Sequence, residues 1–228
     1  MKPIYKSFEY ILLLSIIFSN YSCEKKPTDY RYFLNGMEVV YPGIASNIQV
    51  KPGNSRLLFT WVPSSDPSVT KYIMYWNNGS DSTIGDVTSF PASDTIKTYI
   101  NNLKEGIYIF VVYFFNAKGD KSVPTNIENV KVYGEKYTES LLNRTISKIN
   151  YANKNLTITW NMPDSVNINT EVLYTNVLDQ IRTIYLQPDS STLNLTDWKS
   201  PTKIYYRSSY KPQRNAIDTF KVTYIDSI

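Results

Sequence analysis

The stretch Leu57-Leu58-Phe59-Thr60-Trp61-Val62-Pro63 returns 99 residues later as Leu156-Thr157-Ile158-Thr159-Trp160. In both copies apolar residues occupy alternate positions, which is the pattern of a half-buried β-strand. A tyrosine follows each tryptophan after fourteen residues, at Tyr75 and Tyr174. Similarity at a fixed long period indicates repeated structural units, and about 100 residues is the usual size of one sandwich domain. We therefore predict two tandem copies of one such domain.

Strand patterns continue along the rest of the chain. Short runs of alternating, β-branched and aromatic residues recur about every ten residues, as in an all-β sandwich. The turn clusters between them include Pro52-Gly53-Asn54, Asn77-Asn78-Gly79 and Lys118-Gly119-Asp120. Only Tyr137 to Leu142 has the pattern of a helical turn. The sequence predicts an all-β protein with two immunoglobulin-like sandwiches, over residues 46–134 and 146–228.

Composition excludes most catalytic chemistry. The chain has 228 residues, no histidine and one cysteine, so it lacks a Ser-His-Asp triad, a histidine metal ligand and an internal disulfide. We expect no cofactor and no metal. The 24 basic and 20 acidic residues give a net charge of +4 and are scattered, which argues against a nucleic-acid partner. Paired carboxylates need no histidine, so a glycan hydrolase stays open as a remote alternative.

The first residues have the layout of an export signal. Lys2 and Lys6 precede the apolar run Tyr10–Phe18, and small or polar residues lead on to Cys23. Basic, apolar and polar parts in this order are typical of a signal peptide. The apolar run is too short for a membrane span, which needs about 20 residues. We predict a signal peptide over residues 1–22; a short buried helix is the alternative.

The only cysteine comes directly after this segment, in Ser22-Cys23-Glu24. Its position resembles the lipobox of bacterial lipoproteins, although Asn20 stands where that pattern prefers an aliphatic residue. The resemblance implies a lipidated Cys23, a tether over residues 23–45 and a membrane partner through the lipid anchor. We therefore predict an outer-membrane lipoprotein of the cell envelope, and the sequence leaves open whether it faces the periplasm or the outside.

A later segment resembles a fibronectin type III domain. Leu103-x-x-Gly106-x-Tyr108-x-Phe110-x-Val112 is similar to the strand of that family that carries its tyrosine corner. The resemblance implies the same sandwich for the first copy. The second copy is a degenerate version, because Trp198 stands in place of the corner leucine and no glycine follows.

The mature chain also resembles an uncharacterised lipoprotein family of polysaccharide-degrading gut bacteria. The residues that carry this resemblance are Tyr41-Pro42-Gly43, Tyr75-Trp76-Asn77-Asn78-Gly79 with Asp81-Ser82, Ser140-Leu141-Leu142-Asn143-Arg144, and Asn215-Ala216-Ile217-Asp218-Thr219-Phe220. The resemblance implies a place beside an outer-membrane glycan-uptake system. Glycans and outer-membrane transporter proteins are the partners that it suggests.

The aromatic residues divide into core and surface candidates. We predict that Trp61 and Trp160 are core residues, because each lies on an alternating strand. A constant offset of 99 residues makes Glu171 and Thr175 of the second copy equivalent to Tyr72 and Trp76 of the first. Charged and polar side chains are unlikely in a core, so this alignment predicts that Tyr72 and Trp76 face outward.

These residues give the functional prediction. Flat aromatic rings can stack on sugars, and tyrosine tolerates a wet interface. The candidate ligand-binding residues are Trp76, Tyr72, Asn78, Tyr205, Tyr206 and Tyr210. We predict a non-enzymatic envelope lipoprotein that presents or spaces a binding surface, with an accessory glycan-binding role. The alternative is a structural or protein-interaction module that docks on an outer-membrane partner.

Overall fold

The computed structural model describes residues 40–87 and 95–228. The predicted signal peptide, the lipid attachment at Cys23 and most of the predicted tether lie outside the described residues. The chain from Tyr41 onward forms one compact unit. Within the described ranges, no helix is both long and apolar enough to cross a membrane.

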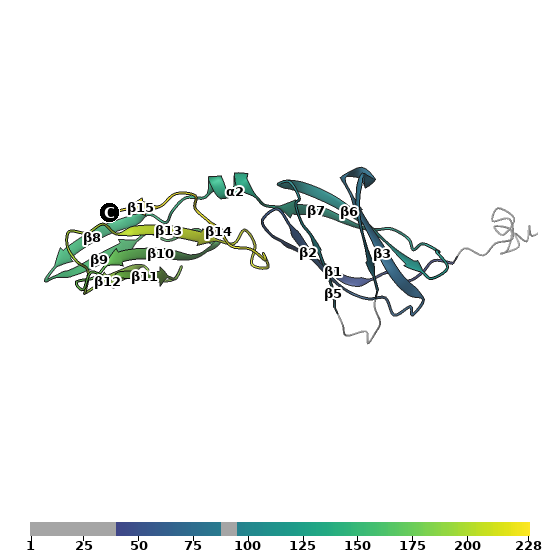
Figure 1. The fold of residues 1–228 in the computed structure, drawn as a ribbon, viewed down its shortest axis with the longest axis horizontal. Helices are drawn as coiled ribbons and strands as arrows, with labels where there is room; N and C mark the ends of the chain where they lie inside the picture. The colour runs from purple at the N-terminus through teal and green to yellow at the C-terminus, as the bar shows by residue number, and fades with distance from the viewer. Residues whose placement is uncertain (1–39, 88–94) are drawn as a thin grey trace, which may run out of the picture. The chain divides into compact units, whose positions relative to one another are not determined.

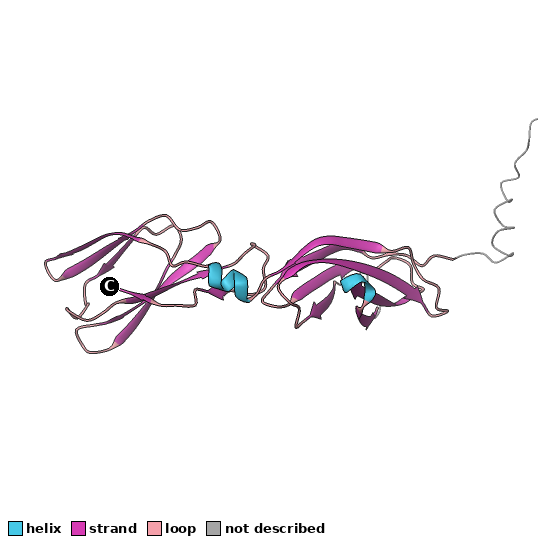
Figure 2. Ribbon diagram, turned by 90° about the horizontal axis from the view of Figure 1, so that it is seen from above, coloured by secondary structure: helices cyan, strands magenta, loops and turns pink. Residues whose placement is uncertain are grey.

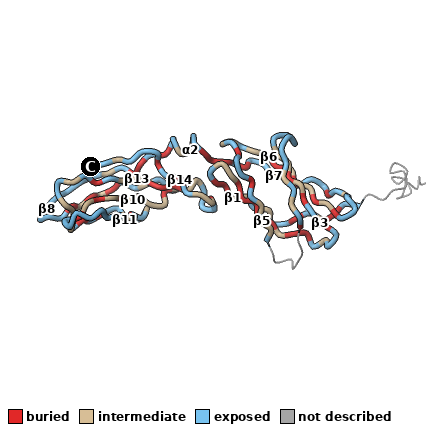
Figure 3. The backbone as a smooth tube through the Cα atoms, viewed as in Figure 1, coloured by how far each residue is buried: buried red, intermediate tan, exposed pale blue. Residues whose placement is uncertain are grey.

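The first sandwich consists of two antiparallel sheets (Figures 1 and 2). The three-stranded sheet has the order β1 (Ser46–Pro52), β2 (Leu57–Val62) and β5 (Ile96–Ile100). The four-stranded sheet has the order β4 (Asp81–Asp86), β3 (Val69–Trp76), β6 (Gly106–Asn116) and β7 (Thr125–Val132). Residues of both sheets fill the space between them: β6 alternates between inward and outward positions, whereas nearly all of β2 is buried. Figure 3 shows the buried parts of the strands in red.

The second sandwich repeats this arrangement. One sheet has the order β12 (Thr192–Leu195), β9 (Asn155–Trp160) and β8 (Ile146–Ala152). The other contains β11 (Ile181–Leu186), β10 (Asn167–Thr175) and β13 (Tyr205–Tyr210), and β13 also pairs with the short strands β14 (Phe220–Lys221) and β15 (Asp226–Ser227). The prediction of an all-β protein with two tandem sandwiches is confirmed. In the described residues the helices are short: η2 (Asn77–Gly79) and α2 (Glu135–Ser140).

The repeated tryptophans are core residues, as predicted. Trp61 is 1% exposed and Trp160 is 3% exposed. Each meets a tyrosine ring edge to face: Trp61 meets Tyr72 at 4.8 Å between ring centroids, and Trp160 meets Tyr206 at 5.0 Å. Such aromatic pairs add about 0.5–1.5 kcal/mol beyond the area that they bury.

The tyrosine corner is also present in the first copy. The hydroxyl of Tyr108 donates to the carbonyl of Lys104 at 2.9 Å, which ties the start of β6 to the segment before it. In the second copy the indole Nε1 of Trp198 donates to the carbonyl of Thr202 at 3.1 Å. The degenerate copy therefore braces the same region with a different side chain.

The outward orientation predicted for Tyr72 and Trp76 is wrong. The inward residues are Tyr72, Met74 and Trp76 in β3 and Thr170, Val172 and Tyr174 in β10. Tyr72 lies eleven positions after Trp61, whereas Thr170 lies ten positions after Trp160. The connection is thus one residue shorter in the second copy, and a one-residue shift moves every side chain of a strand to the other face. The constant offset therefore paired inward residues with outward ones.

A third apolar cluster lies where the two copies join. It contains Tyr133, Leu141, Tyr210, Phe220 and Val222, all buried. The rings of Tyr133 and Phe220 are 6.2 Å apart. Tyr133 directly follows β7, Leu141 lies in the linker, and the other three come from β13, β14 and the segment that follows β14. The cluster therefore ties the linker to both copies.

A polar contact accompanies this cluster. The carboxylate of Asp218 accepts hydrogen bonds from Nε of Arg56 at 2.9 Å, from Nη2 of Arg56 at 2.5 Å and from the backbone N–H of Asn54 at 2.8 Å. The hydrogen bonds from Arg56 hold the pKa of the Asp218 carboxyl below its ordinary value. The segment Asn215–Phe220, noted in the sequence, thus contributes to the joint between the copies.

Candidate functional site

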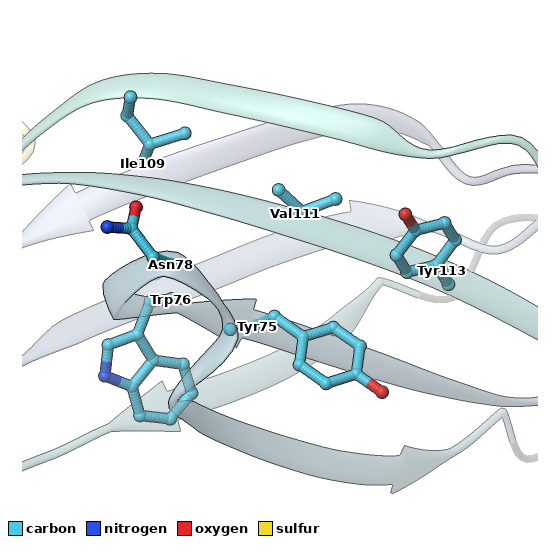
Figure 4. Close-up of a pocket in the computed structure, with 7 residues that line it drawn as sticks. Tyr75, Trp76, Asn78, Ile109, Val111 and Tyr113 are labelled. Carbon is cyan, nitrogen blue, oxygen red and sulfur yellow. The ribbon is translucent and has the colours of Figure 1, made fainter.

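A groove of about 270 Å³ lies on the outward face of the four-stranded sheet in the first sandwich (Figure 4). Its lining comes from β3, from the turn η2 and from β6. The lining residues are Tyr75, Trp76, Asn78, Gly79, Ile109, Val111 and Tyr113.

Strand register brings the groove residues together. Across β3 and β6, Tyr75 pairs with Val111 and Ile73 pairs with Tyr113. Alternate residues of a strand point to the same side, so all four share the outward face. The rings of Tyr75 and Tyr113 meet edge to face with centroids 6.1 Å apart. The two tyrosines thus form one continuous aromatic surface.

The turn η2 places an amide beside these rings. Asn77, Asn78 and Gly79 have φ angles of 49°, 55° and 84°, a left-handed conformation that asparagine and glycine tolerate best. The side chain of Asn77 donates to Asp81 at 2.5 Å and fixes the turn. The exposed amide of Asn78 makes no hydrogen bond with the described residues. It is therefore available to a ligand in the groove.

Trp76 has a double role. It is half-buried and packs against the core of the first sandwich, with its ring 5.8 Å from that of Phe110. It nevertheless lines the groove. Trp76 is thus a wall of the groove, while Tyr75 and Tyr113 are the rings that point outward.

Two of the predicted binding residues are enclosed by the protein. Tyr72 is 5% exposed, and its hydroxyl shares a hydrogen bond with Oγ1 of Thr98 at 2.5 Å. Tyr210 is also 5% exposed and donates to the carbonyl of Leu142 at 2.5 Å. Burial raises the pKa of the Tyr210 hydroxyl. Both rings serve packing and offer no free face.

The other two residues predicted in the second sandwich lie on opposite faces of β13. Tyr206 is half-buried against Trp160, and burial raises the pKa of its hydroxyl. Tyr205 is 45% exposed and pairs with Leu173 of β10. The structure therefore brings Trp76 and Asn78 together in one groove, and leaves Tyr205 as a separate surface residue.

The groove offers no acid pair for hydrolysis. None of its lining residues carries a carboxylate, whereas glycoside hydrolysis uses two. Within residues 40–87 and 95–228, no cluster of three or more acidic or cysteine side chains could hold a metal ion. The groove is equipped for binding through rings, an amide and hydroxyls.

A second hollow, of about 320 Å³, is lined by all five residues of the Ser140–Arg144 segment. Arg144 is 4% exposed and donates to the carbonyls of Asn161 and Gln187 at 2.7 and 3.3 Å. Burial lowers its pKa. The lining of this hollow includes one carboxylate, that of Asp164. Arg144 therefore pins the linker to the second sandwich, a structural role for this segment.

The sequence reasoning missed Tyr75, Tyr113, Ile109 and Val111. A signal for the three residues of β6 was present in that strand, where the corner pattern assigns Tyr108, Phe110 and Val112 to the core. The odd-numbered residues between them must then face outward. Because those residues are apolar too, the strand lacks the polar alternation that normally marks an exposed face.

Comparisons with known proteins identify the family. A family model, DUF4998, described as a domain of unknown function, matches residues 23–220; the chain therefore belongs to this family. The chain is similar to the chicken CNTN1 FN1-FN3 domains at 15% identity, with a TM-score of 0.40, covering 84% of this chain and 66% of that one. It is similar to a two-domain fibronectin type III segment of chicken tenascin at 15% identity, with a TM-score of 0.31, covering 81% and 99%. No curated protein matches it.

Proposed function

We propose that this member of the DUF4998 family is a non-enzymatic protein that binds a carbohydrate chain in the groove of its first sandwich. The observation that carries the proposal is the outward pair Tyr75 and Tyr113, flanked by the wall of Trp76 and by the free amide of Asn78.

The chemistry of the groove suits a sugar. A sugar ring presents C–H groups on its faces and hydroxyls at its edge, so it stacks on an aromatic ring and hydrogen-bonds around it. Tyrosine supplies both an apolar face and a hydroxyl, and the amide of Asn78 supplies a donor and an acceptor. A shallow groove open to solvent also leaves room for the rest of a polymer.

A carbohydrate array tests this proposal. The mature chain from residue 23, with Cys23→Ala to keep it soluble, is compared with the same chain carrying Tyr75→Ala or Tyr113→Ala. We expect each change to lower affinity about fivefold or more, on the analogy of a nucleic-acid base stacked on one aromatic ring, which is worth on the order of 1–3 kcal/mol. Tyr185→Ala is the matched control, since Tyr185 is 55% exposed on the second sandwich. Retained binding in both groove variants would refute the site.

The proposal includes attachment to the cell envelope through a lipid on Cys23. Its support is the lipobox-like position of the only cysteine and the export layout before it. An acylated cysteine would hold the groove at a membrane beside a glycan-uptake assembly. Radiolabelled palmitate should enter the protein in its native host and should not enter the Cys23→Ala variant; equal labelling of both would overturn this part.

One observation favours a second candidate function, docking on a protein partner. The same outward face exposes Ile84, Ile107 and Ile109, at 65%, 71% and 58%. Aliphatic side chains gathered on one exposed face are typical of protein interaction sites. Crosslinking in the native envelope distinguishes the two functions, because a protein partner would be captured through this face, and Ile107→Ser would abolish the capture without lowering carbohydrate affinity.

A further inference from the structure

Two lysines stand at one end of the outward face that contains the groove. Lys71 of β3 lies with its Nζ 5.9 Å from the ring centroid of Phe115, and Lys121 lies with its Nζ 4.4 Å from that of Tyr113. Lys71 pairs with Phe115 across β3 and β6, and Phe115 forms a bridge with Lys121. Both ammonium groups thus lie beside the aromatic residues of β6.

The lysines extend the groove along the strands. Lys71, Ile73 and Tyr75 are alternate residues of β3, so they follow one another on the same face. Four residues of extended strand cover roughly 13 Å. A polymer that stacks on Tyr75 and Tyr113 and continues along β3 therefore reaches both ammonium groups.

In the described ranges neither ammonium group belongs to an ion pair. Within the part of the chain that the structure describes, no carboxylate oxygen lies within 4.0 Å of either Nζ. Two acidic residues occupy neighbouring positions: Asp86 pairs with Lys71 across β3 and β4, and Asp120 precedes Lys121 and accepts a hydrogen bond from the Asn116 amide at 2.8 Å.

The equivalent face of the second sandwich is arranged differently. There the carboxylate of Glu171 in β10 forms ion pairs with Lys221 at 3.3 Å and Arg207 at 3.6 Å. It also accepts a hydrogen bond from the hydroxyl of Tyr185 at 3.3 Å. On that face Glu171 thus forms ion pairs with two cations. Among the described residues of the first sandwich, Lys71 and Lys121 have no such carboxylate partner.

We infer that the ligand of the groove is an anionic polysaccharide, with carboxylate or sulfate groups that meet Lys71 and Lys121. This inference rests on the proposed carbohydrate function and adds the charge of the ligand. A lysine ammonium acts as a compact point charge for such anions. The aromatic rings would hold the sugar faces while the two lysines select chains with negative charge.

Dextran, dextran sulfate and polygalacturonate test the inference. Dextran and its sulfate share one backbone and differ in charge, and polygalacturonate separates carboxylate from sulfate recognition. Binding of each polymer to the mature Cys23→Ala chain is measured by affinity electrophoresis and calorimetry at low and high salt. We expect at least one anionic polymer to bind tenfold or more tightly than dextran, with affinity that falls as salt rises.

Charge-neutral variants locate the effect. Lys71→Gln with Lys121→Gln should lose at least tenfold in affinity for the anionic polymer and most of its salt dependence. The control is Lys148→Gln with Lys203→Gln, an equal change of net charge at exposed lysines of the second sandwich, which should bind like the parent chain. Tyr75→Ala should weaken binding at any salt concentration.

The failures of the two proposals are distinguishable. Binding of a neutral glycan that depends on Tyr75 but not on the two lysines would overturn the anionic inference and keep the carbohydrate function. Equal loss in both lysine pairs would show unspecific charge attraction and would also overturn it. No binding of the parent chain to any glycan would overturn the proposed function itself.

Discussion

Replacing Tyr72 and Tyr75 one at a time tests the face assignment on which the site depends. The two tyrosines lie three residues apart on β3, and the structure gives them opposite roles. Tyr72 is 5% exposed, packs edge to face on Trp61 at 4.8 Å and shares a hydrogen bond with Thr98. Tyr75 lies on the outward face, where its main aromatic neighbour is Tyr113.

The expected losses of stability differ several-fold. Tyr72→Ala removes a buried ring and leaves a cavity between the sheets, which costs about 3–5 kcal/mol for aromatic side chains. Tyr72→Phe keeps the ring and loses only the hydroxyl contact with Thr98, worth about 1 kcal/mol. Tyr75→Ala removes a partly exposed ring from a groove, so we expect a loss of about 1 kcal/mol or less.

Urea unfolding followed by tryptophan fluorescence measures these differences in residues 23–228 carrying Cys23→Ala. Trp61 and Trp76 report on the first sandwich, and Trp160 and Trp198 report on the second. The order of midpoints should be parent, Tyr75→Ala and Tyr72→Phe close together, and Tyr72→Ala far below. A larger loss for Tyr75→Ala than for Tyr72→Ala would refute the register and, with it, the groove.

Three further predictions concern the close contacts of the fold. Gly85→Ala should destabilise the first sandwich, because a new Cβ would clash with the ring of Tyr72, and it should add little further loss to Tyr72→Ala, where that ring is absent, as measured by urea unfolding. Arg144→Met should lower the thermal midpoint of the second sandwich, since the carbonyls of Asn161 and Gln187 lose a donor; an unchanged midpoint by calorimetry would contradict this. The pKa of Asp218 is held below its ordinary value of 3.8, so its contact with Arg56 stabilises the joint fully above that value and is lost as pH falls through the lowered pKa. Between about pH 6 and about pH 3, Asp218→Asn should therefore lose less stability than the parent chain, and parallel curves would refute the role of the carboxylate.

The fold was predictable because several local signals agreed. The repeated strand around Trp61 and Trp160 gave the domain count, and the pattern from Leu103 to Val112 gave the corner at Tyr108. Short strands with turn clusters leave few alternatives to a sandwich. The split of the last strand into β14 and β15 was not predictable, because the segment after Tyr210 lacks a sustained alternation and its pairing depends on distant contacts.

The site was only partly predictable, for a geometric reason. Trp76 and Asn78 were identified, but the face of β3 was assigned from the offset between the copies. A loop that differs by one residue has little effect on stability, yet it reverses the face of the strand that follows. Sequence comparison within a chain therefore fixes the faces of strands only when the length of each loop is known.

The two copies show how one scaffold acquires a site. In β10 the position opposite Arg207 holds Glu171, and the two side chains form an ion pair on the outward face. In β3 the outward positions hold Ile73 and Tyr75, and the partners on β6 are Tyr113 and Val111. An ion pair at the surface satisfies its own groups, whereas exposed rings and unpaired lysines have unmet capacity for contact. The two outward faces thus differ at the centre of the sheet, where the second sandwich has an ion-paired Glu171 and the first has the ring pair Tyr75 and Tyr113. On the proposed function, binding should be lost through Tyr75 and Tyr113 and not through Tyr185.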